Sequence, residues 1–120
     1  MESGPSGQEA TKPEIAYDAF AALDLRAARV ISAERHPNAD KLLVLTIDLG
    51  PLGQRQIVAG IAQHYGPESL VGKTIAVVAN LKPVRLRGIE SRGMLLAGSA
   101  EGRVVLLTTM DELPAGATIS

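Results

Sequence analysis

The feature that most constrains the fold is a series of short segments with strand-like hydrophobic patterns, separated by turns. In LLVLTIDLG (residues 42–50), leucine and isoleucine alternate onto one face from residue 43 to residue 49, and the other face is also largely apolar. Both faces of this strand are therefore expected to be covered. Segments 24–34 and 55–61 predict strands before and after it. The polar loop HPNADK (36–41) predicts a hairpin connection between the first two strands.

The order of the later segments indicates the topology. A short helix is expected within 62–73, with Pro67 at its first turn, followed by strands over 74–81 and 93–99 and a sixth over 104–108. Three strands, a helix and two strands is the order of the OB-fold, which commonly binds oligonucleotides. The sequence thus predicts an all-β fold with short helices: a five-stranded OB-fold Greek-key barrel with an N-terminal helix over 15–22 and a C-terminal extension. The glycines expected at bends of this barrel are Gly88, Gly93 and Gly98.

Composition limits the class of protein. The chain has 120 residues, 46% of them hydrophobic, and no cysteine, which suits one domain without disulfides or thiolate metal ligands. Residues 1–14 are rich in Gly, Pro, Ser and Glu and predict a disordered tail or linker, leaving 15–120 as the domain. No apolar run approaches the roughly 20 residues that span a bilayer. We therefore expect a cytoplasmic protein with no membrane partner.

Charge is distributed unevenly along the chain. The net charge is −1, yet the first thirteen residues of NLKPVRLRGIESRGMLLAGS (80–99) hold four cations and one acid, Glu90. In an extended segment Arg85 and Arg87 would point to one side. Two interpretations stay open from the residues alone. The cations could protect a solvated strand edge from aggregation, or they could bind a polyanion.

Catalytic motifs do not fit the sequence. GPESLVGKT (66–74) has five residues rather than four between its glycines and leads into a strand, so it is not a phosphate-binding P-loop. GIESRG (88–93) has the wrong spacing for a nucleophile elbow. His36 is interpreted as a solvated loop residue, with an acid–base group alongside Glu34 and Asp40 as the alternative, and His64 as a surface residue of the short helix. We expect no catalysis by this chain alone, no metal, no cofactor and no small-molecule substrate.

Three long stretches together resemble a known family. They are YDAFAALDLRAARVISAERHPNADKLLVLTIDLG (17–50), RQIVAGIAQHYGPESLVGKTIAVVANLKP (55–83) and RLRGIESRGMLLA (85–97). They resemble the tRNA-binding OB-fold domain found at the C-terminus of many methionyl-tRNA synthetases and as free-standing structure-specific tRNA-binding proteins. Val84-Arg85 departs from the pattern, because many relatives carry two basic residues there. The resemblance covers about residues 17–119.

The resemblance implies a function and a set of contacts. It implies a tRNA-binding domain that is structure-specific and largely independent of sequence. Such a domain raises the tRNA affinity of an aminoacyl-tRNA synthetase, in the first place a methionyl-tRNA synthetase, either as part of the same chain (in cis) or as a separate protein (in trans). The catalytic core of such a synthetase is then an expected partner, and the chain could be an excised domain of methionine–tRNA ligase. By position in the family pattern, the implied RNA-binding residues are Lys41, Arg55, Asn80, Lys82, Arg85, Arg87, Ser91, Arg92 and Met94.

The scarcity of aromatic residues bears on how RNA would be read. Tyr17, Phe20 and Tyr65 are the only aromatic residues, and none lies on the expected binding strands. Readers of single strands usually stack bases on aromatic side chains. We therefore expect recognition of backbone geometry and tRNA shape rather than sequence. Gly60 and Gly93 are interpreted as glycines that the backbone needs.

Two other functions and an oligomeric state remain to be weighed. The alternatives are a protein–protein assembly module of a synthetase complex and a single-stranded nucleic-acid-binding OB-fold. Bacterial members of the resembled family are commonly dimeric through segments outside the barrel, which predicts a homodimer. Its expected contacts are Phe20, Val105, Leu107, Met110 and Leu113.

Overall fold

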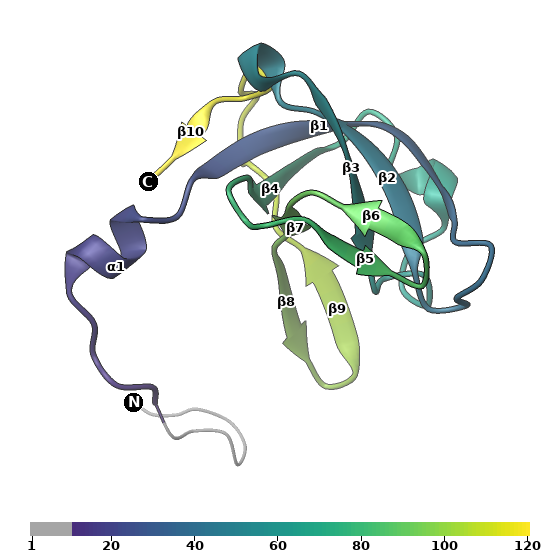
Figure 1. The fold of residues 1–120 in the computed structure, drawn as a ribbon, viewed down its shortest axis with the longest axis horizontal. Coiled ribbons are helices and arrows are strands. Elements are labelled where there is room, and N and C mark those ends of the chain that lie inside the picture. Colours follow the sequence, from purple (N-terminus) through teal and green to yellow (C-terminus); the bar gives the residue numbers. More distant parts are fainter. Residues whose placement is uncertain (1–10) are drawn as a thin grey trace.

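A computed structural model describes residues 11–120. One short helix, α1 (Tyr17–Ala21), precedes ten strands, and most of the chain is in strands or tight turns (Figure 1). Residues 1–10, most of the predicted tail, lie outside the described part. The helix is shorter than the predicted 15–22 and buries none of its side chains. No helix among residues 11–120 has the length and apolar character needed to cross a membrane.

The main sheet is built from the segments with the clearest strand patterns. Its path is β3-β2-β1-β4-β7 with antiparallel pairings, and the strands are β1 (Leu25–Arg35), β2 (Leu43–Asp48), β3 (Gln54–Ala59), β4 (Thr74–Val78) and β7 (Met94–Leu95). The long strand β1 pairs with β4 over its first half and with β2 over its second, and the register shifts between Val30 and Ser32. Such a bulge bends the strand, so β1 can belong to both sides of the barrel.

The prediction of an OB-fold-like barrel is confirmed. The strand order, a nearly closed sheet and the contacts of β3 with β7 reproduce the expected topology. The expected short helix appears as a 3-10 turn at Pro67–Ser69 between β3 and β4. Both faces of β2 are largely covered, as its pattern predicts. The largest fully buried side chains are Val30, Leu43, Leu45, Ile47, Leu49, Ile57, Ile75 and Val77.

The chain after β4 departs from the predicted order. The expected fifth strand over 93–99 is divided: β7 pairs with β4 for two residues, and β8 (Ala97–Ala100) then leaves to form a separate hairpin with β9 (Arg103–Leu106). The edge of β4 is shared, because the N–H of Ala76 donates to the carbonyl of Leu107 while the N–H of Leu96 donates to the carbonyl of Ala76. A further hairpin, β5 (Val84–Leu86) and β6 (Ile89–Ser91), lies between β4 and β7.

The C-terminal segment returns to the start of the barrel. Strand β10 (Thr118–Ile119) pairs with the first residues of β1, and a 3-10 turn at Gly50–Leu52 joins β2 to β3 beside it. Gly50 lies against the backbone of Ala115, and Gly116 lies against the backbone of Leu49. A Cβ on Gly50 would collide with the carbonyl group of Ala115, and a Cβ on Gly116 with that of Leu49. Both have positive φ (60° and 90°), so only glycine suits this crossing.

Candidate nucleic-acid interface

The β5–β6 hairpin carries the predicted RNA-facing arginines. Its strands pair Leu86 with Ile89, which leaves a two-residue turn of Arg87 and Gly88. Both turn residues have positive φ (53° and 93°), the conformation of a type I′ hairpin turn. The prediction that Arg87 extends the strand beside Arg85 is therefore wrong. Arg87 lies at the tip, in a conformation that costs a non-glycine residue about 1–2 kcal/mol.

The segment after the hairpin closes the barrel against β3. The N–H of Arg92 donates to the carbonyl of Gln56 (2.9 Å), and the N–H of Val58 donates to the hydroxyl of Ser91 (2.9 Å). That hydroxyl in turn donates to the carbonyl of Gly93 (3.1 Å). Ser91 is 2% exposed, so its side chain replaces a backbone acceptor in the barrel wall. Gly93 has φ +124°, and a Cβ there would lie 3.1 Å from the carbonyl oxygen of Val78, which confirms that the backbone needs glycine at this position.

His36 joins the loop after β1 to the same hairpin. Its Nε2 lies 3.0 Å from the carbonyl oxygen of Leu86, and its Nδ1 accepts the N–H of Asn38 at 3.0 Å. A neutral imidazole has one donor and one acceptor, so these partners place the proton on Nε2. The ring is 5% exposed. The prediction of a solvated loop histidine is wrong, because the ring is buried between two segments that are distant in the sequence.

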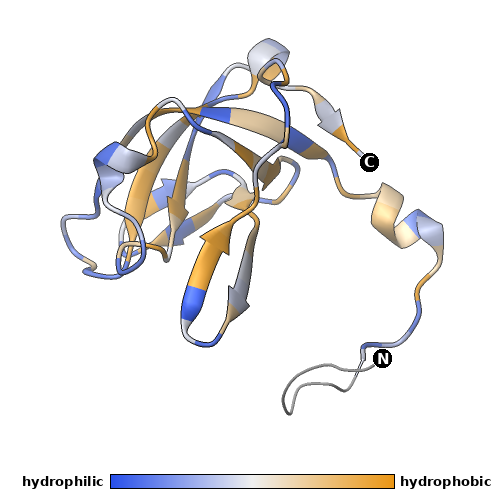
Figure 2. Ribbon diagram, turned by 180° about the vertical axis from the view of Figure 1, so that it is seen from behind, coloured by the Kyte–Doolittle hydropathy of each residue, from blue (hydrophilic) through white to orange (hydrophobic). Residues whose placement is uncertain are grey.

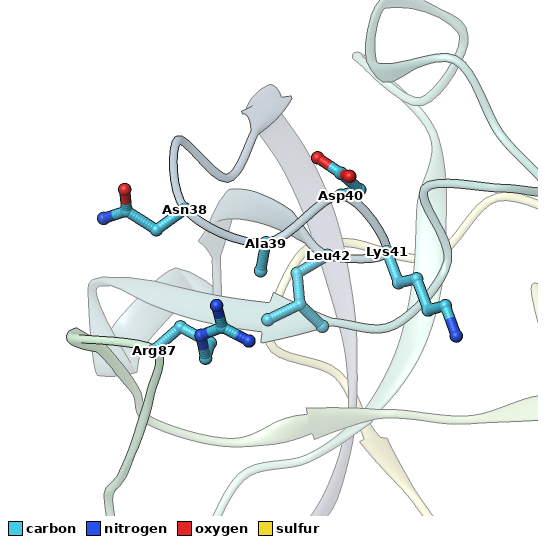
Figure 3. A pocket seen from close by; sticks show the side chains of 6 residues that line it. All are labelled: Asn38, Ala39, Asp40, Lys41, Leu42 and Arg87. Carbon is cyan, nitrogen blue, oxygen red and sulfur yellow. The ribbon is translucent and has the colours of Figure 1, made fainter.

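A hollow of about 510 Å³ lies between this loop and the hairpin tip. It is lined by Asn38 to Leu42 on one side and by Arg87 on the other (Figure 3). In this view the guanidinium of Arg87 lies below Ala39 and beside the end of the Leu42 side chain, whereas the carboxylate of Asp40 points away from it. In OB-folds, the loop between the first two strands and the loop before the last strand flank the oligonucleotide site. The hollow occupies that location.

A second hollow of about 340 Å³ lies between the hairpin, β7 and the end of β3, and is named here the apolar groove. Its floor is formed by buried residues of β3 and β7, including Val58 and Leu95. Its walls carry exposed apolar side chains, with Leu81, Val84 and Met94 between 42% and 52% exposed. Its one charged lining residue is Lys82.

Five exposed cations lie on the loop and the hairpin that form these hollows. Lys41 and Arg87 line the first hollow, and Lys82 lines the apolar groove. Arg85 lies on β5, and Arg92 directly follows β6. Within residues 11–120, the one ion pair joins Arg26 to Asp24 (Nε–Oδ1 2.9 Å), far from this region along the chain. Glu90 lies opposite Arg85 in the hairpin register, but Arg85 donates instead to the carbonyl of Gly88 (2.8 Å). Positive charge is therefore left without a carboxylate partner among the described residues. The set is called the basic strip and consists of Lys41, Lys82, Arg85, Arg87 and Arg92.

Comparison with known proteins identifies the family. A family model described as "Putative tRNA binding domain" matches residues 25–118, nearly the whole described chain. The chain belongs to this family. The match runs from the first residue of β1 into β10 and so includes the basic strip, both hollows and the β8–β9 hairpin.

Relatives among the methionine–tRNA ligases are close in sequence. The chain is 56% identical over 108 residues to a methionine–tRNA ligase of Methanothrix thermoacetophila, with 90% of the chain and 16% of that protein aligned. It is 58% identical over 106 residues to the methionine–tRNA ligase of Thermotoga maritima, with 88% and 17% aligned. The chain thus spans about a sixth of the length of these relatives.

Solved structures share the whole fold. A protein from Pyrococcus horikoshii described as MetRS-related has a TM-score of 0.85 and 36% identity, covering 91% of this chain and 100% of its own. The CsaA chaperone of Bacillus anthracis has a TM-score of 0.82 and 39% identity, covering 90% and 100%. The resemblance to methionyl-tRNA synthetase domains and free-standing relatives is thereby confirmed.

Some predicted RNA-binding residues are engaged within the protein. Asn80 accepts the N–H of Asp24 (2.9 Å) and donates to the carbonyl of Ala22 (2.8 Å), which ties the end of β4 to the segment before β1. Arg55 is half-buried and donates to the carbonyl of Ala79 (2.6 Å). With the hydroxyl of Ser91 also engaged, these three residues shape the barrel. Met94 and the five cations of the basic strip keep exposed side chains.

Two residues that sequence reasoning missed support the strip. His36 ties the loop to the hairpin, and the amide of Gln56 donates to the carbonyl of Glu90 (2.8 Å), which holds β6 to β3. The only sequence signal for His36 was its place at the head of a polar loop, which did not separate a buried ring from an exposed one. His64, by contrast, is exposed, as predicted, although it lies in a turn before the 3-10 helix.

The residues predicted for dimerisation lie outside the barrel wall. Val105 on β9 and Leu107 just after it are exposed, and most residues of β9 are hydrophobic (Figure 2). Leu107, Met110 and Leu113 line a groove of about 680 Å³, and Met110 is 97% exposed. Phe20 lies on α1, which stands apart from the barrel (Figure 1). This set, α1 together with residues 104–113, is called the apolar extension.

Proposed function

We propose that this domain binds the phosphates of tRNA. In doing so it raises the tRNA affinity of an aminoacyl-tRNA synthetase, in the first place a methionyl-tRNA synthetase, in cis or in trans. The basic strip carries this proposal. Five exposed cations without a carboxylate partner among residues 11–120 flank the face on which OB-folds bind oligonucleotides. Lysine and arginine contacts to phosphate position a protein on nucleic acid without reading sequence.

The partner and setting follow from the relatives. The methionine–tRNA ligases that it resembles are about six times longer than the aligned part, so the catalytic step is proposed to lie in a separate synthetase core. This domain would supply binding alone, in the cytoplasm. A domain linked to or associated with that core raises the effective concentration of tRNA near it. We propose no chemistry for the chain itself.

Recognition is proposed to depend on tRNA shape. The basic strip offers no aromatic platform among residues 11–120. Tyr17 and Phe20 lie on α1, and Tyr65 lies against β9, where its hydroxyl accepts the N–H of Leu106 (3.1 Å). Base stacking is the usual source of affinity for single strands. The proposal therefore favours folded RNA over an unstructured strand.

Competition binding tests this proposal. Unrelated tRNAs should bind within a few-fold of one another, and single-stranded RNA of equal length should bind clearly more weakly. Strong preference for one tRNA would show base reading instead. Tighter binding of the unstructured strand would favour the single-stranded nucleic-acid OB-fold.

We also propose that the domain forms a homodimer through the apolar extension. Helix α1 buries none of its five residues, and so short a helix is not stable in water without packing. Exposed apolar side chains of α1 and of residues 104–113 could pack against the same residues of a second copy. Light scattering at micromolar concentration tests this. Twice the monomer mass of 12.6 kDa is expected, and a mass near 12.6 kDa would reject the dimer.

A further inference from the structure

Phosphate binding alone does not explain the exposed apolar side chains of the apolar groove. Phosphate contacts need cations and N–H groups, yet Leu81, Val84 and Met94 expose apolar side chains beside Lys82. Strand alternation explains how both kinds of residue are presented. Val84 and Leu86 face the groove, whereas Arg85 between them lies on the other face of β5.

The groove offers almost no hydrogen-bonding side chain to a ligand. Ser91 lines it, but its hydroxyl already accepts the N–H of Val58 and donates to the carbonyl of Gly93. The remaining polar side chain is that of Lys82 at the rim. An occupant is therefore held by apolar contact inside the groove and by charge at its edge.

Gly60 provides a second, independent sign of a close ligand. Its φ is not in the left-handed region, and a Cβ added there would meet only a methyl group of Leu42 at 3.8 Å, an ordinary contact. The prediction that the backbone needs glycine is thus not met at Gly60, in contrast to Gly93. A glycine without an internal steric reason suits the close approach of another molecule. Gly60 lines the groove where β3 ends.

We propose that the apolar groove holds one unstacked nucleobase of a bound RNA. This inference rests on the proposed tRNA binding and specifies how the RNA is gripped. The volume of about 340 Å³ is near the lower end of the roughly 300–1,000 Å³ of small-ligand sites. A flat group of that size fits, and Lys82 can hold a phosphate of the same nucleotide at the edge of the groove. Charge complementarity selects a nucleotide over a neutral apolar group.

The proposed site accepts any of the four bases. Discrimination between bases needs hydrogen-bond donors and acceptors aimed at their edges, and the one polar side chain of the groove without a partner among the described residues is that of Lys82. Dispersion against the thioether of Met94 and the methyl groups of Val84 is available to every base. The groove therefore favours RNA that has an unpaired nucleotide near a folded stem, without favouring a sequence.

A single tryptophan reports on the groove directly. The chain contains no tryptophan, so Val84→Trp places one emitter at a groove wall that is 52% exposed. Val71→Trp is the matched control, because Val71 is 49% exposed and lies in the turn after the 3-10 helix, outside the groove lining. Both proteins are titrated with unfractionated tRNA and with a fully paired, blunt-ended RNA duplex, while the anisotropy of dye-labelled RNA records binding.

The proposal predicts a selective change in emission. Bound tRNA should quench the Val84→Trp protein at least about twofold more than the Val71→Trp protein, since a base stacks on the indole in the groove. Bound duplex should leave both emissions nearly unchanged. Equal quenching of the two proteins by tRNA would overturn the proposal, as would quenching of the Val84→Trp protein by an apolar peptide but not by tRNA. If tRNA gives no anisotropy change at all, the proposed function fails instead.

The second measurement uses a substitution that shortens a side chain of the groove and introduces no new group. Met94→Ala should weaken tRNA binding about three- to tenfold through the lost apolar contact, with the salt dependence and duplex binding unchanged. Val71→Ala should leave all three quantities as they are. If Met94→Ala weakens tRNA and duplex binding equally, the groove does not hold a base.

Discussion

Both the region of the basic strip and the apolar extension expose apolar side chains, but the charged residues near those side chains differ. At the basic strip, Val84 and Met94 lie among five cations, and the backbone beneath is fixed by Ser91 and His36. In the apolar extension, the groove lined by Leu107 and Met110 has no lysine or arginine among the described residues of its lining, and its charged residues are the acids Asp111 and Glu112. Helix α1 buries none of its side chains. The sign of the charge therefore separates a surface suited to a polyanion from one that would repel it.

The largest expected effect comes from removing charge from the basic strip. The triple substitution Lys82→Gln, Arg85→Gln, Arg92→Gln should lower tRNA affinity by about 3 kcal/mol, roughly a hundredfold, at about 1 kcal/mol for each lost charged contact. Filter binding or anisotropy measures it. The control removes three exposed cations elsewhere, Arg29, Lys73 and Arg103, in the same way. Equal losses in both proteins would mean that net charge, not the strip, attracts the RNA.

The support beneath the strip is tested by Ser91→Ala. The change leaves the buried N–H of Val58 without its acceptor, so the free energy of unfolding should fall by about 1–3 kcal/mol. Urea denaturation measures it. Ser99→Ala, at an exposed position in β8, should change stability by less than about 0.5 kcal/mol. An unchanged stability of Ser91→Ala would show that the hydroxyl does not close the barrel.

The hairpin tip should show opposite effects on stability and binding. Asparagine tolerates positive φ better than arginine, so Arg87→Asn should raise the free energy of unfolding by about 0.5–1 kcal/mol. The same change should weaken tRNA binding several-fold, because a cation at the mouth of the hollow is lost. Arg87→Lys is the control: it keeps the charge and the strained turn. Tighter binding by Arg87→Asn would contradict a role for the tip.

The smallest expected effect on RNA contacts comes from the apolar extension. Phe20→Ser with Leu107→Ser should halve the mass in light scattering and leave the far-ultraviolet circular dichroism of the barrel unchanged, since both side chains are exposed. The salt dependence of tRNA binding per copy should stay the same. A monomer whose salt dependence collapses would mean that the two surfaces act as one.

The barrel was predictable where local pattern decides the structure. Apolar runs such as 42–50 specify a strand covered on both faces, and β1 to β4 appear where the sequence places them. The fifth strand was not predicted correctly, because β7 and Leu107 share the edge of β4. Such pairing depends on residues that are distant in the sequence. Long-range contact also explains His36, whose partner Leu86 lies 50 residues away.

The candidate site was predicted in its charges but not in its conformation. Arg87-Gly88 lacks the Asn-Gly or Asp-Gly signature of a two-residue turn, so alternation suggested that the strand continues through Arg87. The engagement of Ser91 and Asn80 by backbone groups of other elements has no local signal either. The order of residues shows that cations gather between residues 82 and 92, whereas the fold decides that Ser91, within the same stretch, is buried.

The salt dependence of tRNA binding tests the central claim most directly. If phosphates of tRNA lie on the basic strip, about four to six contacts at about 0.7–0.9 each predict that log affinity falls against log salt concentration with a slope of about −3 to −5. Titrations at increasing potassium chloride, at fixed pH and temperature, measure that slope. A slope indistinguishable from zero would contradict electrostatic binding by this domain.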